Sequence, residues 1–327
     1  MKNKIMAMLV AFGLVGSVSA VEVNENLSIN GFIDGSISKT DNIAATGDSA
    51  DWGLDEIEVS FLFNVGSVSG TVALESQNIG SGDDDIGLEQ AHFTYTLENG
   101  VSLTFGRYGS ALGLEREDPA GLYTVSRAYS TNFNLGDINN NAKEGLTVSY
   151  AAEAWTLGVS IENPAGTIRS GGTKNDLDFE VALSYTGIEN LSVGIGYFKD
   201  NENSGLVTAG GAPEDDVTNI HATYQVGKAL LGAEWTQIDR SANGTGLTEG
   251  DLDAHMFLVD YDVSDKLGVA VRYSQWARTS ALDSDTITIA PNYAITDSLG
   301  AILEYSSTDV DVAAGAASQD SDLIALE

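Results

Sequence analysis

Apolar and polar residues alternate with a period of two along almost the whole chain, and this restricts the fold more than any other feature. Clear examples are Leu27–Ile37, Ile57–Phe63, Leu177–Tyr185 and Leu267–Tyr273. Such alternation is typical of strands with two unlike faces. Most segments run for about ten residues, the length with which a tilted strand crosses a bilayer. The sixteen predicted strands are 27–38, 54–65, 68–77, 88–97, 101–108, 144–151, 154–162, 177–186, 190–199, 216–226, 229–238, 252–262, 266–276, 285–295, 298–307 and 321–327.

The connections between these segments alternate in length. Each even-numbered strand is followed by a short turn, such as Gly66–Ser67 or Gly227–Lys228, and each odd-numbered strand by a long polar loop. A soluble sandwich has no reason to sort its loops in this way. The pattern therefore predicts an all-β transmembrane antiparallel β-barrel of sixteen strands. The long loops are 39–53, 78–87, 109–143, 163–176, 200–215, 239–251, 277–284 and 308–320.

Aromatic residues recur near the strand ends, on the apolar face. Rings of amphipathic aromatic residues mark the two interfaces of a membrane barrel. Those before the short turns are Tyr95, Tyr150, Tyr185, Tyr224, Tyr261 and Tyr293, and those near the long loops are Tyr197, Trp235, Tyr273 and Tyr305.

The polar face of the strands carries the charges. A packed core could not hold so many unpaired carboxylates, so we expect this face to line a water-filled lumen. The carboxylates are Asp34, Glu58, Asp178, Glu180, Glu234, Asp260, Asp262 and Glu304, and the one base among them is Arg272.

The first twenty residues are typical of a signal peptide, with Lys2 and Lys4, an apolar run and a small-residue cleavage site at Ala20. The predicted barrel domain is then 21–327. The formal net charge of −33 argues against nucleic acid as a partner and favours cations. The chain has no cysteine, which excludes disulfides and thiolate metal sites.

The longest loop, 109–143, combines charges of both signs with large apolar side chains. A solvated tail would hold fewer such groups, so we expect it to fold back onto the barrel. One reading places Arg107, Arg116, Arg127 and Arg272 opposite Glu115, Glu117 and Asp118 as two charged sides of a constriction. The other is plain ion pairing that holds the loop to the wall, and both can apply.

The chain resembles the Gram-negative porins. The most specific local match is Leu103–Tyr108, with the sequence LTFGRY, followed by the longest loop in third position. The resemblance implies that this loop enters the lumen and narrows it. It also implies a homotrimer in the outer membrane, in contact with lipid and lipopolysaccharide.

One feature departs from the family pattern. Its barrels usually end on an aromatic residue in a full last strand, whereas this sequence stops at Leu323–Glu327 without one. Two interpretations stay open: further residues follow, or the barrel closes in an unusual way.

Enzymatic chemistry has little support. His92 and His221 fall on the polar face, and no Ser, His and orienting group are spaced as a catalytic site requires. The acidic loop segments 81–87 and 213–216 could bind Ca²⁺ weakly, but solvated loops are the simpler interpretation. No cofactor is expected.

The hypothesis is a channel for passive diffusion of small hydrophilic solutes and ions, with a preference for cations. One alternative is a substrate-specific channel, in which Tyr123 and Tyr129 offer stacking faces to a sugar. Another is a structural or adhesive barrel that is closed by its own loop.

Overall fold

The computed structural model describes residues 20–42, 48–77, 86–115, 119–128, 143–163, 177–199, 215–240, 251–278, 282–312 and 320–327, and the structural statements below concern these. They form seventeen strands and one short 3₁₀ helix, η1 (Pro119–Gly121). No described helix is long and apolar enough to cross a membrane. The strands are β1 (Val21–Asn24), β2 (Leu27–Asn42), β3 (Ser49–Val65), β4 (Val68–Gln77), β5 (Gly87–Thr96), β6 (Val101–Tyr108), β7 (Lys143–Ala151), β8 (Trp155–Glu162), β9 (Asp178–Tyr185), β10 (Leu191–Lys199), β11 (Asp215–Val226), β12 (Ala229–Arg240), β13 (Leu252–Asp262), β14 (Leu267–Arg278), β15 (Leu282–Thr296), β16 (Leu299–Val312) and β17 (Ser321–Leu326).

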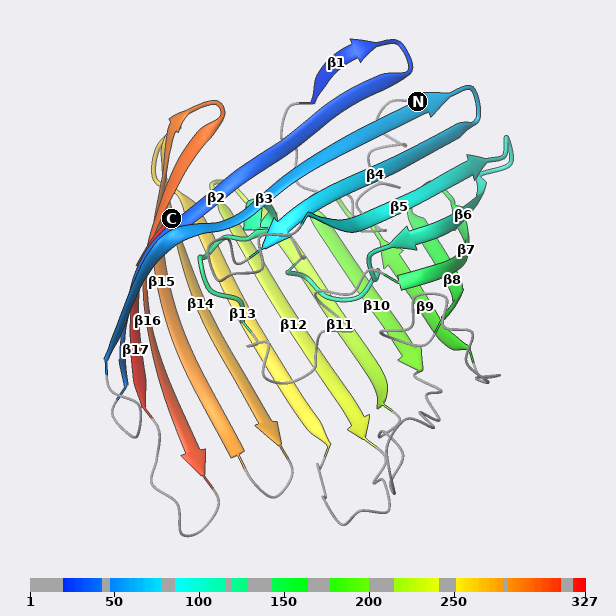
Figure 1. Ribbon diagram of the computed structural model, residues 1–327. Coiled ribbons are helices and arrows are strands. Elements are labelled where there is room, and N and C mark those ends of the chain that lie inside the picture. Colours follow the sequence, from blue (N-terminus) through cyan, green and yellow to red (C-terminus); the bar gives the residue numbers. More distant parts are fainter. Residues whose placement is uncertain are drawn as a thin grey trace, which may run out of the picture.

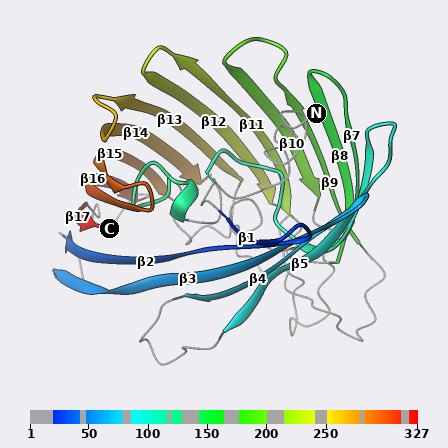
Figure 2. The same cartoon turned by 90° about the horizontal axis from the view of Figure 1, so that it is seen from above.

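Strands β2 to β17 form a closed antiparallel ring (Figure 1, Figure 2). Each strand pairs with the next, and β17 pairs back onto the second half of β2, with Leu326 opposite Ile37. The additional strand β1 folds back on the start of β2, where Val21 lies opposite Ile29. The ring confirms the predicted sixteen-strand barrel, and closure leaves it without the free edge strands of an open sheet.

The described strands differ from the prediction at their ends. Strands β2, β3, β15 and β16 extend further toward the long loops than the alternation indicated, and β1 was not predicted. At Ser38–Asn42 the sequence has no apolar face, yet β2 still pairs there with β3 and β17. Backbone pairing therefore continues beyond the part of the strand that hydrophobicity marks.

Short turns join the strands at one end of the ring. Gly66 and Gly227 lie in two-residue turns with φ of 63° and 59°, which glycine adopts without the strain other residues would incur. The opposite end carries the long connections, most of which lie outside the described residues.

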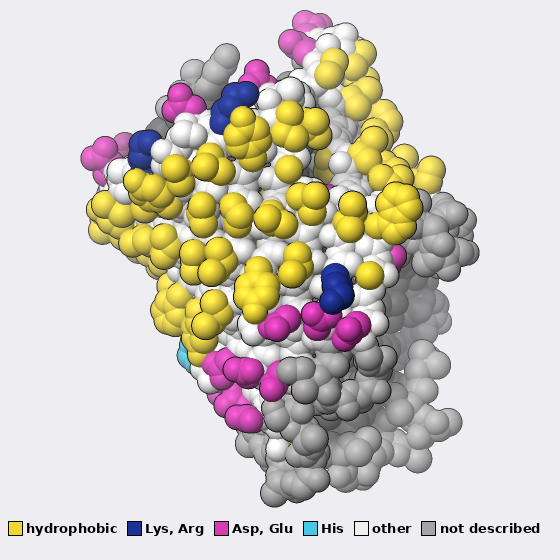
Figure 3. Space-filling model, turned by 90° about the vertical axis from the view of Figure 1, so that its left-hand side faces the viewer, with side chains coloured by type: hydrophobic (Ala, Val, Ile, Leu, Met, Phe, Trp, Pro, Cys, Tyr) yellow, Lys and Arg dark blue, Asp and Glu magenta, His cyan; other side chains and the backbone are white. Residues whose placement is uncertain are grey.

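The outer face of the ring is a band of exposed apolar side chains. Phe105, Phe257 and Ile287 are each 56% exposed. Figure 3 shows such side chains across one side of the barrel, with acidic residues gathered at the borders of the band. An apolar surface this continuous suits lipid and not water. The predicted aromatic residues at the short-turn end lie on this face, and Tyr95, Tyr150, Tyr224, Tyr261 and Tyr293 are 42–50% exposed.

Parts of the inner face are buried and do not contact water, which corrects the expectation that this whole face lines a water-filled lumen. A hydrophobic cluster lies inside the ring, where Phe198 of β10 and Met256 of β13 are buried against Leu112 of the long loop. The consecutive apolar residues Met256–Val259 were the signal in the sequence, because they place apolar groups on both faces of β13.

We predict that a charge is tolerated on the inner face of β7 and not on its outer face. Val148 is 44% exposed on the outer face, whereas its neighbour Ser149 points inward. The variant Val148→Arg should lower the free energy of unfolding in lipid vesicles by about 2–4 kcal/mol, because the guanidinium meets hydrocarbon. In the matched variant Ser149→Arg the guanidinium meets water, so the free energy of unfolding should fall much less. Urea titrations measure both, and equal losses would contradict the assignment of the two faces.

Candidate functional site

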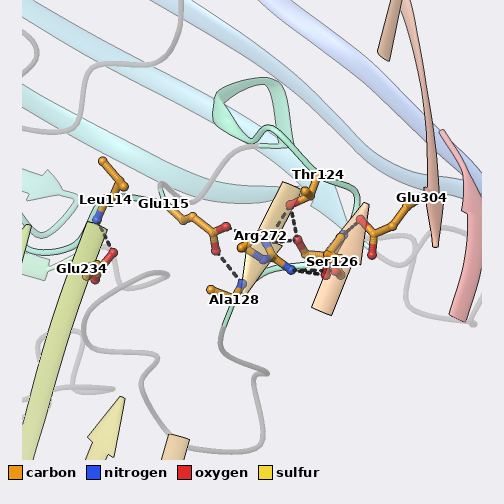
Figure 4. Close-up of polar contacts among 9 residues, drawn as sticks. Leu114, Glu115, Thr124, Ser126, Ala128, Glu234, Arg272 and Glu304 are labelled. Atoms are coloured by element: carbon orange, nitrogen blue, oxygen red, sulfur yellow. Dashed lines mark hydrogen bonds and ion pairs between the residues drawn. The ribbon is translucent and has the colours of Figure 1, made fainter. Parts of the chain in front are cut away.

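The described part of the long loop, 109–115 and 119–128, lies inside the ring (Figure 2). It packs against the inner faces of β9 to β16. Its backbone N–H groups donate to three carboxylates of the wall, two of which appear in Figure 4. The bonds are Ala111 N to Glu180 Oε1, Leu114 N to Glu234 Oε2 and Ser126 N to Glu304 Oε2, each 2.9 Å.

In these contacts two kinds of group, each of which would cost free energy if it were buried without a partner, bind each other. An irregular segment lacks the backbone partners of a helix or sheet, and a buried carboxylate lacks water. A carboxylate that accepts from backbone N–H forms a strong, charge-assisted bond. Glu180, Glu234 and Glu304 are only 5%, 5% and 0% exposed. Sequence reasoning placed them on the correct face but expected them to meet water, because the alternation does not show which part of the wall the loop covers.

Both ends of the loop meet at Glu180. At the start, Ser110 Oγ donates to Glu180 Oε2 at 2.6 Å. At the far end, Lys143 Nζ lies 3.7 Å from the same oxygen and 3.5 Å from Glu162 Oε2. The ammonium also lies 3.3 Å above the centroid of the Phe198 ring, within range of a cation–π interaction. Sequence reasoning placed Lys143 only as the last residue of the charged loop 109–143.

Arg272 of β14 binds the middle of the loop. Its Nη1 donates to Glu115 Oε1 at 2.7 Å and to the Ser126 carbonyl at 2.6 Å, and it also bonds Thr124 Oγ1. Glu115 Oε2 in turn accepts from Ala128 N at 2.7 Å. Figure 4 shows the guanidinium between these groups. For Arg272 and Glu115, the structure has the direct ion pair that was one of the two readings from sequence.

Two glycines of the wall make room for leucines of the loop. A Cβ on Gly196 would lie 1.8 Å from Leu112 Cδ2, and one on Gly232 would lie 3.1 Å from Leu114 Cδ2. Leu112 is 1% exposed, so this contact completes the hydrophobic cluster inside the ring. The close approach of backbone to side chain explains glycine on the inner face of β10 and β12.

Asn219 of β11 is a contact that sequence reasoning missed. Its Oδ1 accepts from Gly113 N at 3.2 Å, and its Nδ2 donates to Glu234 Oε1 at 2.7 Å. The amide thus holds both the loop and the carboxylate beside it. The available signal in the sequence was its period-two spacing from His221 on the polar face of the predicted strand 216–226, and in the structure it is 0% exposed.

Tyr123 is half-buried on the loop and packs against the small cluster of Leu258, Ala270 and Ala290. Burial, with the nearby Asp260 carboxylate, raises the pKa of the Tyr123 phenol above its usual range. Its packed position limits its use as a stacking face.

The other predicted site residues lie apart from this contact. Arg107 on β6 is within electrostatic reach of Glu75 on β4, and Arg127 on the loop is half-buried. Asp34, Glu58 and Asp178 lie on β2, β3 and β9. Arg116, Glu117, Asp118 and Tyr129 lie outside the described residues, as do most of the acidic segments 81–87 and 213–216 and the predicted signal peptide.

The wall opposite the loop is hollowed. A cavity of about 610 Å³ lies on the inner face of β3 to β7, near the short turns. Within the described parts of the chain, no group of three or more His, Asp or Glu side chains is arranged to hold a metal ion. The interior thus has one wall covered by the loop and one wall that bounds open space.

The sequence profile of the Gram-negative porins matches residues 6–316. The chain belongs to this family. As a porin it is an outer-membrane protein, and its barrel is a channel fold. No curated protein sequence matches this porin significantly.

Solved structures resemble the porin in fold at low sequence identity. An anion-selective porin from Comamonas acidovorans has a TM-score of 0.64 and 12% identity, over 92% of this chain and 98% of that one. The outer membrane channel DcaP of Acinetobacter baumannii has a TM-score of 0.62 and 12% identity, over 94% of this chain and 99% of that one. OmpT of Vibrio cholerae in a trimer form has a TM-score of 0.60 and 14% identity, over 92% of this chain and 99% of that one.

We predict that Arg272 is needed to hold the loop against the barrel wall. The variant Arg272→Met leaves the Glu115 carboxylate buried without its cation, which should cost about 3–5 kcal/mol of unfolding free energy. Adding Glu115→Gln should recover part of the loss, because the remaining partner is then neutral. Chemical denaturation in detergent micelles measures both.

The matched control is the ion pair of Lys39 and Asp41, which is 2.5 Å long with side chains 54% and 51% exposed. Lys39→Met should leave stability unchanged, since exposed pairs contribute little. A similar loss in both variants would show that the Arg272 contacts do not hold the loop.

Proposed function

We propose that this porin lets small hydrophilic solutes and ions diffuse passively across the outer membrane, with a preference for cations, and that it works as a homotrimer. The observation that carries the proposal is the division of the interior. The loop is bound to the inner faces of β9 to β16, while the cavity on β3 to β7 stays open. A passage then runs between the loop and the uncovered wall, and the loop sets its width.

The cation preference is supported by the charges that the loop does not bind. On the inner face of β3 and β4, Glu58 lies directly opposite Glu75. Like charges in this position repel each other unless a cation is near. Arg107, within electrostatic reach of Glu75, supplies one positive charge for the two carboxylates. The chain as a whole holds 48 acidic against 15 basic residues. Because the anion-selective porin from Comamonas acidovorans has the same fold, the fold does not decide whether cations or anions are preferred, and the local charges must.

The trimer is supported by the family and by the trimer form of OmpT of Vibrio cholerae, an outer membrane protein with the same fold. Lipopolysaccharide is the expected partner of the outer-leaflet end. Cross-linking of the folded protein, followed by electrophoresis without heating, tests the trimer directly.

Conductance in planar bilayers tests the channel and its selectivity. Wild-type porin should give ohmic steps, and under a KCl gradient its zero-current potential should favour K⁺ over Cl⁻. Glu58→Gln with Glu75→Gln should move this potential toward zero. The control Glu189→Gln removes the same kind of charge in a short turn and should change nothing. Absence of conductance would refute the channel and leave a structural barrel.

Shortening the loop tests its role in setting the width. Deleting residues 119–128 removes the segment that Arg272 and Glu304 bind, so the single-channel conductance should rise. Heat-modifiable mobility on gels shows whether the variant still forms the barrel. An unchanged conductance in a folded variant would mean that the narrowest point lies elsewhere.

A further inference from the structure

The uncovered wall of the lumen carries a regular grid of hydroxyl groups. On β5, β6 and β7, Thr94 lies opposite Thr104, which lies opposite Thr147. In the next row toward the short turns, Thr96 lies opposite Ser102, which lies opposite Ser149. The outward neighbours Phe93, Phe105 and Val148 are 44–56% exposed, which places the hydroxyls on the inner face. We call these six residues the hydroxyl grid.

All six residues of the hydroxyl grid line the cavity of about 610 Å³. This volume lies within the range of about 300–1,000 Å³ that is usual for small-molecule sites. His92 and Tyr108 also line it, with their rings in edge contact at 6.4 Å between centroids. The Nδ1 atom of His92 is buried and has no hydrogen-bond partner among the described residues.

The cavity is almost free of charge in a strongly acidic protein. Glu98, in a short turn, is the one acid among its lining residues. The carboxylates of the opposite wall, by contrast, bind the backbone of the loop. A solute that crosses this porin would therefore meet hydroxyls at the cavity, and a neutral hydroxyl wall neither attracts nor repels ions.

The grid retains capacity for hydrogen bonds after its own contacts are counted. Thr94 and Thr104 share one bond of 2.8 Å, and Ser102 donates to Thr96 at 3.1 Å. Each hydroxyl has one donor and two acceptor positions, so acceptors and rotatable donors remain. Ser102, Thr147 and Ser149 are only 1–5% exposed, so the positions that a solute can reach lie mainly on Thr94, Thr96 and Thr104. Neighbouring strands lie about 4.8 Å apart, a spacing comparable with the width of a sugar ring.

We propose that the hydroxyl grid is a weak binding site for uncharged polyhydroxylated solutes, such as monosaccharides and polyols. The inference deepens the proposed channel function and depends on it for its biological use. Each bond to the solute replaces a bond to water, so the net gain per bond is small and the expected affinity is about millimolar. Weak binding suits a channel, because a tightly held solute would block it.

The experiment uses the full chain, folded in detergent micelles, with glucose and xylitol as probes. Saturation-transfer NMR should show saturable binding to the wild type. The double variant Thr94→Val with Thr104→Val keeps the shape of the side chains and removes two hydroxyls. Its half-saturation concentration should rise about three- to tenfold, the loss expected for one to two net hydrogen bonds.

The matched control is a second threonine pair outside the cavity. Thr286 and Thr308 form the same cross-strand contact at 2.9 Å between β15 and β16. Thr286→Val with Thr308→Val should leave sugar binding unchanged. Non-saturable signals in the wild type, or equal shifts in the two double variants, would overturn the proposal.

Bilayer conductance in KCl separates this inference from the channel function. Saturable, grid-dependent sugar binding with no K⁺ current would refute the channel and leave the site. K⁺ current with no sugar binding would refute the site and leave the channel. Heat-modifiable mobility, measured on each variant, shows that a loss of binding does not come from a loss of fold.

Discussion

A bilayer offers no water to its interior, so each backbone N–H and C=O group there must bond within the protein. This constraint produces the ring of β2 to β17, because only closure onto β2 removes the last free edge. Once the ring is closed, period-two alternation gives one face to lipid and the other to the lumen. The same rule acts on the loop inside. Its irregular backbone has no sheet to join, and the carboxylates of Glu180, Glu234 and Glu304 accept from it instead.

The interior is therefore divided in two. From β9 to β16 the wall is acidic and is covered by the loop. Lys143 pairs there with Glu162 and Glu180, and Arg272 pairs with Glu115. Near the short turns, from β4 to β7, the wall is almost free of charge and rich in hydroxyls, and it bounds open space. The negative charge of the wall thus lies in two places. Part of it binds the loop, and part lies on β3 and β4, where Glu58 is directly opposite Glu75.

The strands could be predicted because their signal is local: alternation within each segment, and short turns after every second one. The place of the loop could not be predicted in the same way. A backbone N–H such as that of Ala111 leaves no mark in the sequence, and its partner Glu180 follows far along the chain. The burial of Phe198 and Met256 likewise depends on Leu112, which lies in a different part of the sequence. Such contacts are decided by the closed ring, which brings these residues to one place.

The pairing of β17 with β2 also bears on how the barrel forms. Residues 321–326 bond to residues 37–42, so the contact that closes the ring joins segments from nearly opposite ends of the sequence. Closure must then wait until almost the whole chain has been synthesised and exported. Until then, fifteen strands with an exposed apolar face have no complete ring to join, and such surfaces aggregate readily. The topology thus makes assembly slow, and it makes the unfolded chain dependent on protection during its passage to the membrane.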